Sequence, residues 1–82
     1  FNPSTVLRFS LPEASVVTLR VHDMLGREVA TLLRGSQRDA GQHEAIFDGT
    51  GLVSGVYSCT IDAVSLESGE RFTAVRQMVM TK

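Results

Sequence analysis

Residues 56–63 read Val-Tyr-Ser-Cys-Thr-Ile-Asp-Ala, and this stretch decides the class of the fold. Its apolar side chains recur at every second position, at Tyr57, Cys59 and Ile61, with polar side chains between them. Successive side chains of a β-strand point to opposite faces of a sheet, so this period of two predicts a strand with one buried face. We interpret Cys59 as a small buried apolar residue, because the only cysteine in the chain has no partner for an internal disulfide.

The same alternation extends along the chain in both directions. Leu7, Phe9 and Leu11 alternate with polar residues until Pro12, which has no main-chain N–H, interrupts the pattern. Further strands are predicted at residues 17–22, 27–33, 43–48 and 71–81. We expect the first two strands to form a hairpin, and the polar residues 34–41 to form a loop.

Turn residues separate the predicted strands at short intervals. The sequences Asp-Met-Leu-Gly at 23–26 and Glu-Ser-Gly-Glu at 67–70 are typical of tight turns between strands. No segment has the 3.6-residue period of a helix. Short strands separated in this way predict an all-β, immunoglobulin-like antiparallel β-sandwich of about seven strands. We expect its core to contain Leu7, Phe9, Leu19, Val21, Val29, Phe47, Tyr57, Ile61 and Met78.

Length and composition limit the class of protein. A chain of 82 residues can enclose one hydrophobic core, so we expect a single domain over residues 1–82. Hydrophobic residues make up 43% and charged residues 21%, which is typical of globular domains, and no apolar run is long enough for a membrane helix. The net charge is −1 and the basic residues are scattered, which argues against nucleic acid as a partner.

The residues that could carry chemistry do not form a recognisable catalytic or metal-binding motif. Ser54 precedes a predicted strand and lacks the Gly-x-Ser-x-Gly turn of a hydrolase. His22, His43 and Cys59 are too dispersed for a zinc site, and the Asp48 turn lacks the further carboxylates of a calcium loop. We therefore expect a protein that is not an enzyme and binds no cofactor.

A series of short motifs resembles, in order and spacing, the C-terminal sorting domains of the type IX (Por) secretion system. These motifs cover residues 2–5 (Asn-Pro-Ser-Thr), 7–12 (Leu-Arg-Phe-Ser-Leu-Pro), 21–29, 41–43, 47–49, 52–57 and 76–82. Such domains are similar to the immunoglobulin-like module of the flagellar hook-capping protein. Two positions depart from the family pattern, because Phe47 stands where Trp is frequent and Gln77 stands where Lys is common.

The resemblance implies that the domain is a label that carries a cargo protein through the outer membrane. Its implied partners are the secretion translocon, a sortase-like enzyme that removes the label, and an N-terminal cargo domain. The implied location is the periplasm in transit, then the cell surface or the medium. The chain begins at Phe1 without an initiator Met or a signal segment, so we expect it to be a domain excised from a larger protein.

The last predicted strand is the candidate binding element. It combines alternating side chains with a terminal cation, so it can belong to the sheet and still present an edge and a charge to a partner. The candidate binding residues are Arg76, Gln77, Met78, Val79, Met80 and Lys82. The alternative function is a structural β-sandwich spacer, or a carbohydrate-binding accessory module of a secreted enzyme. The chain has no Trp and a single Tyr, which disfavours a sugar-binding face.

Overall fold

The computed structural model describes residues 3–81 and consists of six β-strands joined by turns and short loops. The strands are β1 (Ser4–Leu11), β2 (Ser15–His22), β3 (Glu28–Arg38), β4 (Gly41–Asp48), β5 (Gly55–Ser65) and β6 (Arg71–Met80). No helix occurs within this range. The predicted all-β class is confirmed, and the structure has six strands where the sequence predicted about seven.

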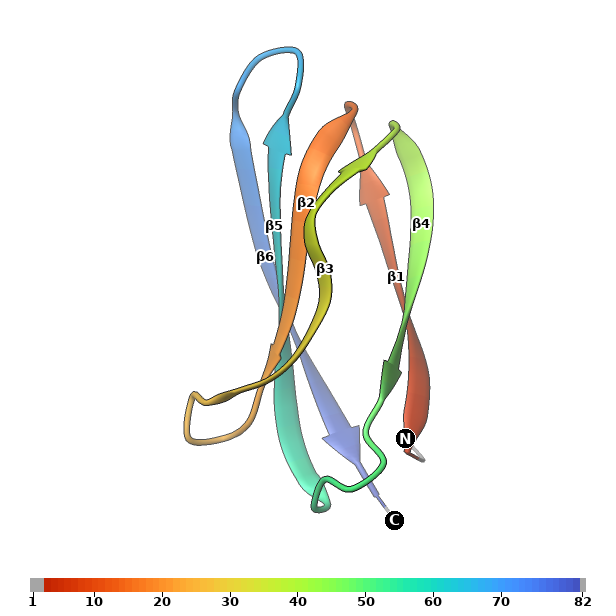
Figure 1. Cartoon of the computed structure of the whole chain (residues 1–82), viewed down its shortest axis with the longest axis vertical. Coiled ribbons are helices and arrows are strands. Elements are labelled where there is room, and N and C mark those ends of the chain that lie inside the picture. The colour runs from red at the N-terminus through yellow and green to blue at the C-terminus, as the bar shows by residue number, and fades with distance from the viewer. Residues whose placement is uncertain (1–2, 82) are drawn as a thin grey trace.

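The strands form two antiparallel sheets that pack face to face, as Figure 1 shows. One sheet contains β1 and β4, and the other has the order β3-β2-β5-β6. This arrangement of two packed sheets fits the predicted immunoglobulin-like sandwich. The beginning of β1, the β4–β5 loop and the end of β6 lie at the same end of the sandwich (Figure 1).

The predicted hairpin between the first two strands is wrong. β1 pairs with β4, from Ser4 opposite Asp48 to Leu11 opposite Gly41, while β2 pairs with β3 and β5. Residues 12–14 instead carry the chain from one sheet to the other. Because the chain crosses over, the apolar faces of β1 and β2 meet across the core. A hairpin would have placed these two strands side by side in one sheet.

The predicted loop at 34–41 is also largely strand. β3 continues to Arg38, and its polar end pairs with β2 through Ser36 opposite Val17 and Gln37 opposite Val16. Main-chain pairing needs no apolar side chains, and β3 lies at the edge of its sheet, so polar residues are tolerated there. The register shifts between Val17 and Leu19, close to Gly35. Gly35 accommodates this irregularity with a φ of 57°, and its N–H donates a hydrogen bond to the Thr18 hydroxyl.

The core lies between the two sheets and contains one face of β1, β2 and β5. The predicted core is confirmed except at Val29 and Met78, which are partly buried and pack against it. Cys59 is fully buried and free, as expected from the sequence. Burial raises the pKa of its thiol, because the charged form is disfavoured away from water. The buried apolar residues are Leu7, Phe9, Leu11, Val17, Leu19, Val21, Phe47, Tyr57, Cys59, Ile61, Ala63 and Met80.

Candidate interaction surface at the end of the last strand

β6, which holds the predicted binding residues, is an edge strand. It pairs with β5 alone, so its other edge has no strand partner among residues 3–81. Its side chains alternate between two faces, which separates the predicted residues into two groups. Gln77 and Val79 are exposed on the outer face of the sheet, whereas Arg76, Met78 and Met80 point to the side that faces the other sheet. Lys82 lies outside the described residues.

Met80 is part of the core. Its side chain is 1% exposed and packs against Gly49 in the loop that follows β4. The Gly49 amide donates a hydrogen bond to the Pro3 carbonyl, so three segments meet at this point. In the folded domain a partner can therefore contact the neighbouring Val79, but it can reach Met80 only by displacing the end of the strand.

Val79 belongs to a larger apolar surface at this end of the sandwich. It lies opposite Val56 on β5, and both side chains are exposed. Val56 also lines a pocket of about 240 Å³ together with Met24, Leu25 and Val53, which are 73–77% exposed. We call these five residues the end patch. Contiguous exposed apolar side chains on a soluble domain are typical of a protein-binding surface.

The turn that carries Met24 and Leu25 is held by Asp23. One carboxylate oxygen accepts hydrogen bonds from the amides of Leu25 at 2.9 Å and Arg27 at 3.0 Å, and the other lies 2.8 Å from Arg27 Nε. The hydrogen bond from the Arg27 amide is the main cause of the lowered pKa of Asp23. Gly26, with a φ of 81°, completes the turn.

The loop that carries Val53 is held by Tyr57. The phenol hydroxyl donates a hydrogen bond to the Val53 carbonyl at 2.5 Å, while its ring is buried beside Phe47 at 6.3 Å between centroids. Met24, Leu25 and Val53 of the end patch are thus presented on hydrogen-bonded turns, whereas Val56 and Val79 lie on strands. Met24, Leu25 and Val53 are not among the predicted binding residues, since they lie in turns outside the alternating pattern. The signal in the sequence that points to them is the presence of apolar residues at turn positions.

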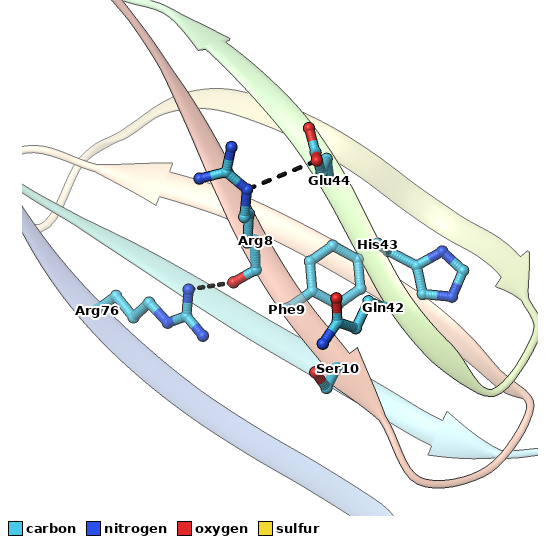
Figure 2. Close-up of a pocket in the computed structure, with 7 residues that line it drawn as sticks. All are labelled: Arg8, Phe9, Ser10, Gln42, His43, Glu44 and Arg76. Atoms are coloured by element: carbon cyan, nitrogen blue, oxygen red, sulfur yellow. Dashed lines mark hydrogen bonds and ion pairs between the residues drawn. The ribbon is translucent and has the colours of Figure 1, made fainter.

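A second hollow, of about 610 Å³, lies at the other sheet between Arg8, Phe9, Ser10, Gln42, His43, Glu44 and Arg76 (Figure 2). His43 stacks on Phe9 at 5.5 Å, and its Nε2 lies 2.7 Å from the Asp39 carbonyl oxygen. In Figure 2 the His43 ring points away from Ser10, so these two residues do not form a nucleophile and base pair. Within residues 3–81 no group of three or more His, Cys, Asp or Glu side chains could hold a metal ion.

The part of the chain that the structure describes contains no helix able to cross a membrane. Comparisons of the chain with models of protein families, with curated proteins and with solved structures find no match in any of the three.

Proposed function

We propose that this chain is a sorting domain that directs a cargo protein across the outer membrane, and that the secretion apparatus reads the end patch. The observation that supports this proposal is the position of the patch beside the end of β6. The motifs that resemble type IX sorting domains include residues 76–82, and Val79 in that segment adjoins the apolar turns at residues 24–25 and 53 through Val56.

An apolar patch suits this role because docking on it needs no active site. Burial of apolar surface contributes about 25 cal/mol per Å² of favourable transfer free energy, and only the part that exceeds the costs of association becomes affinity. Ordered turns reduce those costs, because less conformational entropy is lost on binding. After passage, a sortase-like enzyme removes the domain, and the cargo is released or anchored at the surface. The domain thus resides in the periplasm in transit and then at the cell surface.

The alternative, a spacer or carbohydrate-binding module, predicts a different surface. Sugar-binding faces display aromatic rings. Phe9, Phe47 and Tyr57 are buried, and Phe72 is only 37% exposed. A spacer role predicts that the folded domain does not export a fused reporter.

The test fuses a reporter enzyme to the domain in a bacterium that has a type IX system. The double variant Val53→Thr, Val79→Thr removes two methyl groups from the end patch and should leave most of the cargo in the periplasm. Its matched control, Val6→Thr, Ile46→Thr, changes an exposed apolar pair on the other sheet and should export normally. Melting temperatures of both variants must match the parent domain for the comparison to report recognition.

Three results would decide against parts of the proposal. Normal export of the Val53→Thr, Val79→Thr variant would show that the end patch is not read. Failure of the unmodified, folded domain to export the reporter would reject the sorting role and favour a spacer. If Lys82→Ala slows export while the Val53→Thr, Val79→Thr variant does not, the terminal charge is recognised in place of the end patch.

A further inference from the structure

The two sheets differ in width, and the narrow one leaves part of the wide one uncovered. Antiparallel register partners point to the same face, so Ala74 opposite Ile61 and Arg76 opposite Cys59 face the other sheet. Ile61 and Cys59 are buried, but Ala74 and Arg76 are exposed. The two-stranded sheet therefore covers the inner face of β5 and ends before the first half of β6.

An apolar groove of about 140 Å³ lies where this cover ends. One wall is the end of β1 from Phe9 to Leu11 together with Pro12, and the other is β6 from Phe72 to Ala74, with Ile61 and Ala63 of β5 between them. Arg76 closes one end of the groove. The groove thus lies over the inner face of β5 and β6, beside the edge of β1 where the narrow sheet ends.

The edge of β1 beside this groove has main-chain groups without a strand partner in the described part of the chain. Among residues 3–81, β1 pairs only with β4, and its Arg8 carbonyl instead accepts a hydrogen bond from the Arg76 guanidinium (Figure 2). Main-chain groups of successive residues alternate between the two edges of a strand, so Val6 and Ser10 direct theirs to the same edge as Arg8. Arg76 supplies one of the hydrogen bonds that another strand would make there.

Arg76 is also a cation without a carboxylate partner in the described part of the chain. Arg8 in the same hollow lies 3.5 Å from Glu44, and Arg71 on the same strand lies 3.4 Å from Asp62. No such ion pair forms at Arg76 within residues 3–81, although its guanidinium lies at the mouth of the groove. The groove therefore has an apolar section and a positive end.

We propose that this edge of β1 binds an extended segment of another protein that carries an acidic residue. The segment adds a third strand to the β1–β4 sheet, its apolar side chains cover Phe72 and Ala74, and its carboxylate receives the Arg76 guanidinium. Arg76 leaves the Arg8 carbonyl as the new main chain takes its place. Main-chain pairing then gives affinity, and the alternate side chains give specificity.

The direction of the strands determines the pattern of the bound segment. A segment antiparallel to β1 runs in the same direction as β6 (Figure 1). It passes Phe72 first, then Ala74, then Arg76, each two residues apart. Its sequence is therefore apolar, any residue, apolar, any residue, acidic. This site is separate from the end patch, so the proposal does not depend on the sorting role.

The test measures binding of a fluorescent peptide, Thr-Val-Thr-Val-Thr-Glu-Thr, to the 82-residue domain by anisotropy. A control peptide has Lys in place of Glu. The Glu peptide should bind at least tenfold more tightly than the Lys peptide, and Arg76→Glu should reverse this preference. Arg34→Glu is the matched control, because it makes the same charge change on β3 at the far edge of the wide sheet and should leave the preference unchanged.

A second variant tests the strand edge itself. Ser10→Pro removes an N–H at the free edge of β1 and leaves the main-chain hydrogen bonds to β4 in place. It should therefore lower the affinity for the Glu peptide at least tenfold. Hydrogen exchange of the Val6 and Ser10 amides should slow when the Glu peptide binds. Absence of binding, equal affinity for both peptides, or protection on β6 in place of β1 would overturn the proposal. Self-association of the domain through the β1 edge, seen by sedimentation without peptide, would also overturn it.

Discussion

A Cβ atom placed on Gly49 would lie 2.6 Å from the sulfur of Met80, and 3.1 Å from the carbonyl oxygen of Pro3. Gly49 is not among the glycines with positive φ, so this position needs glycine for space and not for backbone conformation. The close approach joins the start of the chain, the loop after β4 and the end of β6. The last strand is therefore tied to the core at its end, beside the end patch.

Gly49→Ala should destabilise the domain. The added methyl group must displace the Met80 side chain, and overpacking of this kind costs about 1–3 kcal/mol. Urea unfolding measures the change, and the double variant Gly49→Ala, Met80→Ala should lose less than the sum of the two single variants, because the clash is then absent. Additive losses would show that Gly49 and Met80 do not interact.

Phe47→Ala should cost about 3–5 kcal/mol, since the ring is fully buried between the sheets. The neighbouring Ile46→Ala is the matched control, because Ile46 is 68% exposed on the same strand and should cost less than about 1 kcal/mol. Denaturant midpoints report both values. Similar losses for the two variants would contradict the assignment of Phe47 to the core.

Removal of residues 79–82 should lower the melting temperature of the domain and should also reduce export of a fused cargo. The deletion takes away the buried Met80, and Met80→Ala alone should cost about 2–5 kcal/mol. Val79→Thr keeps the shape of an exposed side chain and should leave the melting temperature nearly unchanged. A truncated domain as stable as the parent would show that the end of β6 contributes little to the fold.

Acid should weaken the turn at Asp48. The Thr50 hydroxyl, at 2.6 Å, and the Thr50 amide, at 3.0 Å, donate to the Asp48 carboxylate and lower its pKa. The unfolded chain then binds more protons than the native one near pH 4, so this stabilisation is present above that pH and is lost as pH falls through the lowered pKa.

The variant Thr50→Val measures that contribution. It should lower the melting temperature at pH 6 and have a smaller effect in acid, once the pH has fallen through the lowered pKa of Asp48 and its carboxylate is protonated. Thr5→Val, on β1 opposite Phe47, provides the same substitution away from a carboxylate partner and should behave alike at both pH values. An equal loss at both pH values for Thr50→Val would contradict the role of the charged carboxylate.

Metal chelation should leave the melting temperature unchanged, since the sequence has no motif with the ligand spacing of a metal site. Calorimetry with and without EDTA checks this expectation. A fall of several degrees would reveal a structural metal, because an ion that binds the folded state alone stabilises it by RT ln(1 + [L]/Kd). The turn at Asp48 is the first place to look for it.

The sequence alone determined the positions of most strand residues and most of the core. In residues 56–63 the period of two is uninterrupted, and β5 buries Tyr57, Cys59 and Ile61 as that pattern predicts. Side-chain alternation is a local property of an extended chain, so it can be read without knowing which strands are neighbours. The turn at 23–26 was predictable for a similar reason, since the Asp23 and Gly26 interactions lie within a few residues.

The tertiary structure decided how the strands pair, and it formed both the end patch and the groove beside β1. The alternation of Leu7, Phe9 and Leu11 is compatible with a hairpin to β2 or with pairing to β4, and the packing of two sheets across one core selects the second. Both surfaces join residues more than fifty positions apart in the sequence. Val56 links Val79 to Met24 in the end patch, and Arg76 contacts Arg8 beside the groove. Such contacts follow from the order of strands in the sheets, because local patterns specify which face a side chain occupies and not which strand lies beside it.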